Sequence, residues 1–416
     1  MGRWALTLLV INSTIGVGIF KLPSGVSSLL GQSAPAGYLI AALLVGVWVA
    51  VLAELASQFD GSGGQYLYTR TALGPFAGLQ CGWFSWLTRM SAQAAIINAF
   101  IDYLREWWPG MDGTGRAIVI AAMMGGLAAV NYRGIRGGVW FSNTITIAKL
   151  STLALFILLG LVLAGPPAPR PAEAATSLAG WADALVILVY AFSGFENAPT
   201  SMGEAKSPRR DAAFALLAGM GIVTLCYLFA HIVCARAVPN LPASTLPFAD
   251  ATRSFAGPAG AKLIAAGVML SAFGTVSAAF VTAPRLMFAM AERGELPAFF
   301  AAVHPRFRTP HVSVVIWALL VCGLALAGGF LWNAVLSVAS RLITYALMCA
   351  SLIALRRRAP TADAWRAPGG PALACLGIAF CVVLATRFTS DHLLVIGSVA
   401  VIASTNWILT RPRPLD

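Results

Sequence analysis

The chain has 416 residues, of which 58% are hydrophobic and 11% are charged, and its mean hydropathy is +0.79. A soluble domain has about 45–50% apolar and about 25% charged residues, so this composition excludes an ordinary soluble protein. The net charge of +12 could suggest a nucleic-acid partner, but most of the Lys and Arg residues fall in loops that we place on one side of a membrane. Cytoplasmic loops carry such an excess. We therefore expect no nucleic-acid partner and a multi-pass protein of the plasma (inner) membrane, with both termini cytoplasmic.

Apolar segments long enough to cross a bilayer recur along the whole chain. A spanning helix needs roughly 20 apolar residues, and by this measure we predict an all-α polytopic membrane protein with twelve transmembrane helices in a single domain over residues 1–416. The predicted helices lie near residues 5–30, 36–57, 75–104, 116–132, 141–164, 179–203, 212–237, 259–291, 311–328, 331–355, 371–388 and 392–409.

Two of these segments are interrupted by glycines. Residues 11–20 read INSTIGVGIF, and residues 192–197 read FSGFEN. A broken membrane helix exposes backbone groups that hydrocarbon cannot satisfy, so a break is tolerated only inside protein or beside a watery cavity. One Gly-x-Gly alone could merely permit close helix packing. Two breaks at comparable places instead predict a transporter with inverted repeats and a binding site at mid-membrane.

The positions of the two breaks predict the domain organisation. We expect a five-plus-five inverted repeat, with residues 1–164 as the first repeat and residues 179–355 as the second. The first and sixth helices are then discontinuous. Two additional helices, within residues 371–409, lie outside the repeat.

Four charged residues fall inside or beside the apolar segments. Lys149 lies within the fifth segment, where a charge costs at least roughly 2.5–3.5 kcal/mol and needs a partner, a cavity or a route to the interface. Glu196 follows the second break, where it could gate, carry a proton or accept hydrogen bonds from the broken backbone. Arg89 and Arg341 lie near the middle of their helices, and for both we expect a bracing ion pair, with contact to a substrate carboxylate as the alternative.

The sequence predicts neither an enzyme nor a metal or cofactor site. The seven cysteines and four histidines have no ligand-like spacing, and we find no nucleophile–base arrangement and no phosphate-binding loop. A membrane-embedded enzyme or a sensor on the same fold remains an alternative. The sensor is disfavoured because both breaks are intact.

The chain resembles the amino acid–polyamine–organocation (APC) superfamily of transporters. The resemblance extends over nearly the whole chain and is strongest in residues 203–211. It is carried by INSTIGVGIF at residues 11–20, AELAS at 53–57, GGQY at 63–66, GPF at 74–76, GEAKSPRRD at 203–211, GELP at 294–297 and RTP at 308–310.

The resemblance implies a substrate site made of backbone groups. An amino acid carboxylate would bind the free amides of the first break, and its ammonium would meet free carbonyls at both breaks. Lys149 would take the place that a sodium ion has in sodium-coupled relatives, with Thr275 as a possible neighbour. At the breaks we expect amides from Gly16, Val17 and Gly18, carbonyls from Thr14, Tyr190 and Ser193, and further substrate contacts from Phe192 and Gly194.

We therefore predict a secondary active transporter of amino acids that works by alternating access. The substrate is expected to be neutral and fairly apolar, because the second break offers aromatic rings and no second acidic residue. Transport is expected to be independent of sodium and driven by protons or by exchange. Acidic amino acids or polyamines are the alternative substrates, and the sequence leaves the oligomeric state and the direction of transport open.

Overall fold

The computed structural model describes residues 2–59, 64–134, 138–166, 177–197, 208–357 and 364–410. Within these ranges the regular secondary structure is entirely helical. The helices are α1 (Arg3–Thr14), α2 (Gly18–Leu30), η1 (Gly31–Ser33), α3 (Ala34–Gln58), α4 (Gly64–Leu73), α5 (Pro75–Leu104), α6 (Gly113–Arg133), α7 (Gly138–Leu163), α8 (Leu178–Ala191), α9 (Pro208–Ala237), η3 (Leu241–Ala243), α10 (Pro247–Glu292), η4 (Ala298–Ala301), α11 (His311–Ala327), α12 (Phe330–Arg356), α13 (Gly370–Ala385) and α14 (Ser390–Thr410).

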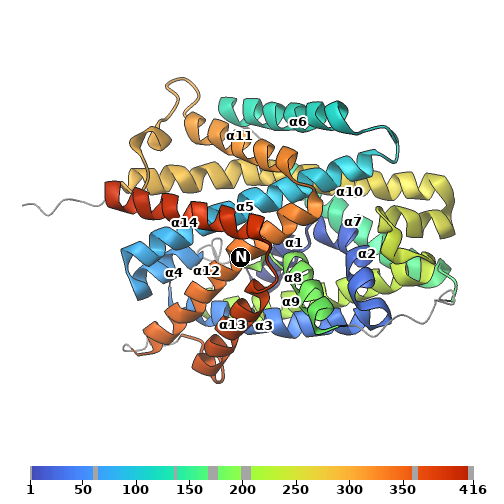
Figure 1. Ribbon diagram of the computed structural model, residues 1–416, viewed down its shortest axis with the longest axis horizontal. Helices are drawn as coiled ribbons and strands as arrows, with labels where there is room; N and C mark the ends of the chain where they lie inside the picture. The colour runs from blue at the N-terminus through green and yellow to red at the C-terminus, as the bar shows by residue number, and fades with distance from the viewer. Residues whose placement is uncertain are drawn as a thin grey trace, which may run out of the picture.

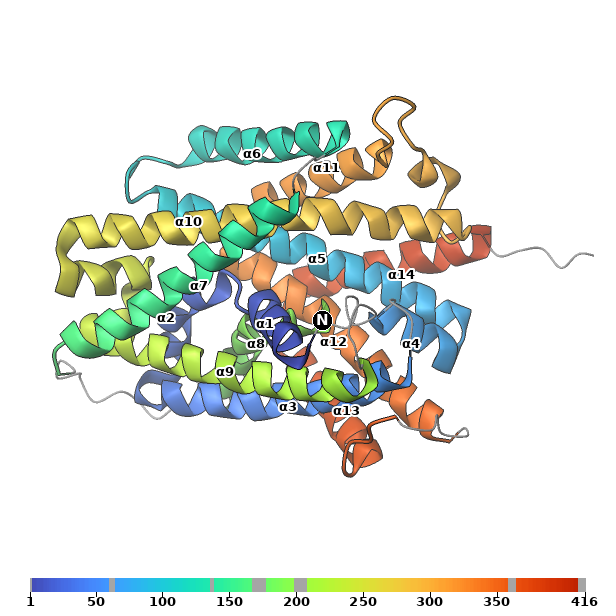
Figure 2. The ribbon, with the colours of Figure 1, turned by 180° about the vertical axis from the view of Figure 1, so that it is seen from behind.

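The described helices form an elongated bundle. Eight helical segments are long and apolar enough to cross a membrane, so the chain is a polytopic membrane protein. In Figures 1 and 2, α6 lies along one edge of the bundle beside α11, and α3 lies along the opposite edge beside α9. The middle is occupied by α5, which packs against α12, α10 and α4. We call the two ends of the bundle the α4 end, on the left in Figure 1, and the Lys21 end, on the right where α2 lies.

The structure refines the predicted helices at four places. The first predicted segment is two helices, α1 and α2, separated by residues 15–17. The helix α4 was not predicted. The helix α10 begins at Pro247 rather than near residue 259, and Gly257 has a non-helical backbone with φ of 68°. The helix α8 ends at Ala191, and the predicted continuation at 198–203 lies outside the described residues, as do residues 203–207 of the GEAKSPRRD motif.

A buried ion pair joins three helices at the α4 end. The Glu54 side chain of α3 is fully buried. It accepts hydrogen bonds from Arg356 Nε and Nη2 at 2.7 Å each, and from the backbone N–H of Ala367 at 2.9 Å. These bonds connect α3 with the end of α12 and with the segment that leads into α13.

We predict that Glu54→Gln destabilises the protein strongly. The change removes the counter-charge of Arg356, and loss of one partner of a buried pair costs roughly 3 kcal/mol or more. The matched control is Asp183→Asn, because Asp183 and Arg387 form a pair of the same geometry, at 2.7 and 3.1 Å, with both side chains about one-third exposed. Thermal unfolding in detergent should show a much larger loss for Glu54→Gln; equal losses would contradict the assignment.

Candidate functional site

The first helix break leaves a row of backbone amides without helical partners. The helix α1 ends at Thr14, where the N–H of Ile15 makes the last helical bond, 2.8 Å to the carbonyl of Ile11. The helix α2 begins at Gly18. Within the described chain, the N–H groups of Gly16, Val17 and Gly18 donate to no backbone carbonyl. The start of α2 is therefore suited to bind an anion.

The second break turns the chain sharply after α8. The carbonyl of Tyr190 accepts hydrogen bonds from the N–H of Ser193 at 3.3 Å and from its Oγ at 2.6 Å. Gly194 then has φ of 112°, a conformation that glycine adopts far more readily than other residues. Its N–H donates to Glu196 Oε2 at 2.8 Å, so this carboxylate closes the turn.

The two breaks lie in direct contact with each other. A Cβ atom on Gly194 would collide with the carbonyl oxygen of Ser13, so the position requires glycine for space as well as for φ. The Tyr227 hydroxyl of α9 lies 3.0 Å from the carbonyl oxygen of Thr14 and 2.9 Å from that of Ala191. Tyr227 therefore bridges the ends of α1 and α8.

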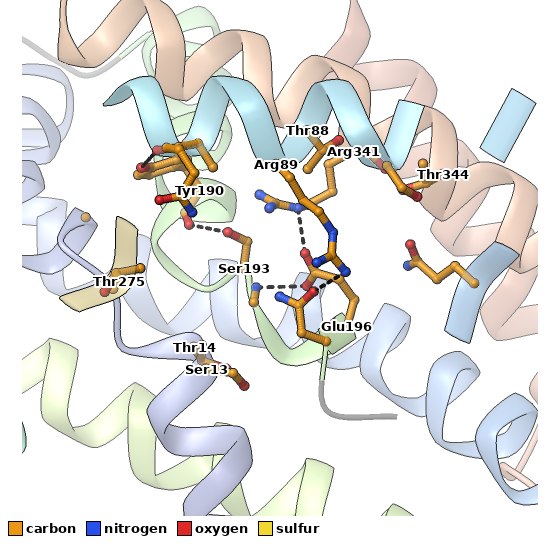
Figure 3. A pocket seen from close by; sticks show the side chains of 18 of the residues that line it. Ser13, Thr14, Thr88, Arg89, Tyr190, Ser193, Glu196, Thr275, Arg341 and Thr344 are labelled. Carbon is orange, nitrogen blue, oxygen red and sulfur yellow. Dashed lines mark hydrogen bonds and ion pairs between the residues drawn. The ribbon is translucent and has the colours of Figure 1, made fainter. Parts of the chain in front are cut away.

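The two breaks open onto one cavity. Its volume is about 210 Å³, far more than the roughly 10–15 Å³ that one water molecule needs. Figure 3 shows its lining side chains, which come from both breaks, α5, α10 and α12. Of the residues predicted from the sequence, the lining includes Thr14, Gly16, Val17, Gly18, Arg89, Tyr190, Ser193, Gly194, Glu196, Thr275 and Arg341.

Two aromatic residues of the second break, one of them the predicted Phe192, lie outside this lining. The Phe192 ring is fully buried and packs against Tyr227, with ring centroids 5.1 Å apart, so it does not line the cavity, and contact with the substrate stays a prediction. Phe195 is likewise buried, against Tyr345. Both rings point into the protein, and the cavity lining is a mixture of polar and apolar groups without them.

Lys149 also lies outside the lining, behind the first break. Its side chain is 5% exposed, and its ammonium donates to the carbonyl of Asn12 in the last turn of α1 at 2.6 Å. The ammonium therefore does not reach the membrane surface. The expected neighbour Thr275 faces the cavity and donates to the carbonyl of Ser271 in its own helix.

The charged side chains of the cavity form a compact network. Arg341 Nε donates to Glu196 Oε1 at 3.0 Å, and both side chains are almost buried, at 6% and 12% exposed. The Tyr345 hydroxyl donates to Glu196 Oε2 at 3.2 Å. Arg89 donates to the side-chain oxygen of Asn197 at 2.8 Å (Figure 3). The bracing ion pair therefore forms for Arg341, whereas Arg89 bonds to an amide.

A family model described as amino acid permease matches residues 1–408 of the chain. The chain belongs to the amino acid permease family. Among its relatives, the serine/threonine exchanger SteT of Bacillus subtilis is 31% identical over 327 residues, covering 75% of this chain and 72% of SteT. The methylthioribose transporter of Bacillus subtilis is 24% identical over 403 residues, covering 92% of this chain and 87% of the relative. An uncharacterized transporter of Mycobacterium tuberculosis is 26% identical, covering 100% and 93%.

The family settles the class of this protein. Its members and the relatives named above are transporters, so the permease is a transporter and not an enzyme. Its place in an amino acid permease family implies a small-molecule substrate of the amino acid class. The many apolar helices agree with a multi-pass membrane protein.

Several polar residues of the permease cavity were not predicted from the sequence. On α5, the residues that line the cavity repeat every three or four positions, as expected for one helix face. They are Gly82, Ser85, Thr88, Arg89, Ala92, Gln93 and Ile96. This spacing of polar residues in an apolar helix is a signal that could have identified them. Tyr227 gave no such signal, because a single tyrosine in an apolar helix does not indicate which carbonyls its hydroxyl meets.

The two ends of the permease differ around the cavity. At the Lys21 end, the Lys21 ammonium lies 2.8 Å from Asp102 Oδ2 and 2.8 Å from the carbonyl of Thr245, and Tyr103 donates to the carbonyl of Phe20 at 2.6 Å. These contacts tie α2 to α5 and to the segment before α10. On the other side, the lining continues to Gln65 and Tyr66 of α4.

We predict that Gly194→Ala destabilises the permease and that Gly16→Ala does not. An alanine Cβ at position 194 meets the Ser13 carbonyl in a backbone conformation unfavourable for alanine, whereas a Cβ on Gly16 has no atom closer than 3.9 Å. Apparent melting temperatures in detergent should fall by several degrees for Gly194→Ala. Wild-type stability of Gly194→Ala would mean that the two breaks are not in contact.

Proposed function

We propose that this permease is a secondary active transporter of neutral amino acids that works by alternating access. The proposed architecture has twelve transmembrane helices, with a five-plus-five inverted repeat over residues 1–164 and 179–355 and two additional helices. We place the protein in the plasma membrane with both termini cytoplasmic. The observation that carries the proposal is the opening of two contacting helix breaks onto one cavity.

The backbone supplies the groups that an amino acid needs. The amides of Gly16, Val17 and Gly18 donate to no backbone carbonyl of the described residues and lie at the positive end of α2, where the substrate carboxylate would bind. The carbonyls of Thr14 and Tyr190 each accept a hydrogen bond from Tyr227 or Ser193. Because a carbonyl oxygen has two lone pairs, the Thr14 carbonyl retains one for the ammonium of the substrate, whereas the Tyr190 carbonyl already accepts from both the N–H and the Oγ of Ser193.

The charges of the lining favour a neutral substrate over a dication. Among the described lining residues Glu196 is the sole carboxylate, and Arg341 already matches it. A polyamine or a basic side chain would therefore meet two arginines and no free acid. The relative SteT, named a serine/threonine exchanger, supports the same substrate class. Acidic amino acids are the second candidate, because Arg89 bonds to an amide rather than to a carboxylate.

Alternating access is supported by the unequal ends of the cavity. The Lys21 contacts join α2 to α5 and to the segment before α10 at one end, and the lining extends toward α4 at the other. With cytoplasmic termini, the α4 end faces the cytoplasm and this conformation faces inward. Opening the outer side then requires the Lys21–Asp102 pair to part.

Lys149 supports transport that does not use sodium. Its ammonium already donates to the Asn12 carbonyl at the end of α1, and a fixed positive charge there repels a sodium ion. A lysine that loses and regains its proton during the cycle would couple transport to protons. A lysine that stays charged would make the permease an exchanger.

We predict that amino acid uptake into proteoliposomes is unchanged when sodium is replaced by choline. Lys149→Met should reduce uptake at least tenfold while expression is kept, because the change removes the link between α7 and α1. Lys262→Met, at an exposed position of α10, is the matched control. Dependence on a pH gradient favours symport, and dependence on internal amino acid favours exchange; sodium stimulation of the wild type would refute the role of Lys149.

We further predict that Gly18→Leu abolishes substrate binding. A Cβ on Gly18 would lie 3.2 Å from the Tyr190 ring, so a larger side chain must push apart the breaks or cover the amides. Gly125→Leu is the control, since Gly125 is exposed on α6 with no atom near its Cβ position. Binding is measured as a ligand-induced thermal shift. Unchanged affinity in folded Gly18→Leu would place the site elsewhere.

A further inference from the structure

Three polar side chains on the cavity wall have atoms that no group satisfies. Thr88 Oγ1, Gln93 Oε1 and Arg341 Nη1 are buried and have no hydrogen-bond partner among the described residues. The three residues are only 6%, 9% and 5% exposed, and all three line the cavity. Polar atoms that are sealed from water without a partner cost free energy. A ligand group that hydrogen-bonds to these atoms therefore gains more binding free energy than it would from polar atoms that already have partners.

The helices α5 and α12 place these three side chains on the wall of the same cavity. The two helices are antiparallel, since Ser337 donates to the carbonyl of Thr88 and Asn98 donates to the carbonyl of Gly328. Side chains lean toward the N-terminus of their own helix. Gln93 therefore leans toward the level of Thr88 from one side, and Arg341 leans toward it from the other.

The surroundings of Arg341 favour a neutral polar group over a carboxylate. Its charge is matched by Glu196 at 3.0 Å, so its remaining N–H groups need an acceptor rather than a counter-charge. A substrate carboxylate on Nη1 would share one guanidinium with Glu196, and like charges so close repel. Arg89, the other arginine of the wall, is half-buried and hydrogen-bonded to Asn197.

We propose that Thr88, Gln93 and Arg341 form a side-chain subsite that binds a hydroxyl or amide group of the substrate. The permease then selects small, polar, neutral amino acids over their aliphatic isosteres. This inference rests on the proposed function, because it assumes that the carboxylate and ammonium of an amino acid occupy the two breaks. A hydroxyl fits the subsite because it can accept from Arg341 and donate to the oxygen of Gln93.

The test compares L-threonine with L-valine, which differ by a hydroxyl in place of a methyl group. Uptake of radiolabelled L-threonine into proteoliposomes is inhibited with unlabelled threonine, valine, serine, alanine and glutamate. We expect threonine to inhibit at about tenfold lower concentration than valine, and serine to exceed alanine likewise. Because Arg341 also braces Glu196, the informative variants are Thr88→Val and Gln93→Leu, which should bring the threonine-to-valine ratio toward one.

Thr224→Val is the matched control for the variants. The Thr224 hydroxyl is bonded to the carbonyl of Met220 in its own helix, and the residue lies outside the cavity lining, so this variant should keep the wild-type ratio. Equal inhibition by threonine and valine, a ratio that neither variant changes, or strongest inhibition by glutamate would each overturn the subsite while leaving amino acid transport intact. Failure of the wild type to take up any amino acid would overturn the proposed function itself.

Discussion

The structure depends on one constraint: two helices that are interrupted inside a membrane must satisfy their free backbone groups within the protein. The permease meets it by pressing the breaks together. Gly194 lies against the carbonyl of Ser13, and Tyr227 bridges the carbonyls of Thr14 and Ala191. Lys149 covers the carbonyl of Asn12 from the other side. Helices α7, α8 and α9 are thereby all tied to the end of α1.

In this arrangement, backbone groups and side chains recognise different parts of the substrate. The amides of the first break donate to no backbone carbonyl in the part of the chain that the structure describes. Several carbonyls at the breaks, in contrast, already accept hydrogen bonds from side chains of the protein. Recognition of a carboxylate by backbone does not depend on the identity of a side chain, so it suits a feature that all amino acids share. The differences between amino acids are then left to the walls that α5 and α12 provide.

How far the sequence predicts this structure depends on the kind of information in each segment. Hydropathy is strong over twenty residues, so each of the twelve apolar segments overlaps a described helix, whereas the mixed residues of α4 carried no such signal. The glycine breaks identified the cavity because broken helices have few alternatives in a membrane. The sequence did not show that the Phe192 ring is buried against Tyr227 and away from the cavity. The contacts of Tyr227 depend on helix rotation relative to distant segments, which one sequence does not encode visibly.

The most direct test of the account is an experimental structure of the permease with a bound amino acid, using L-threonine at saturating concentration. The account predicts that the α-carboxylate lies about 3 Å from the amide nitrogens of Gly16 to Gly18, with the threonine hydroxyl directed to the wall of α5 and α12. A carboxylate held by Arg89 or Arg341 instead, with the amides of the first break in contact with no substrate atom, would contradict it.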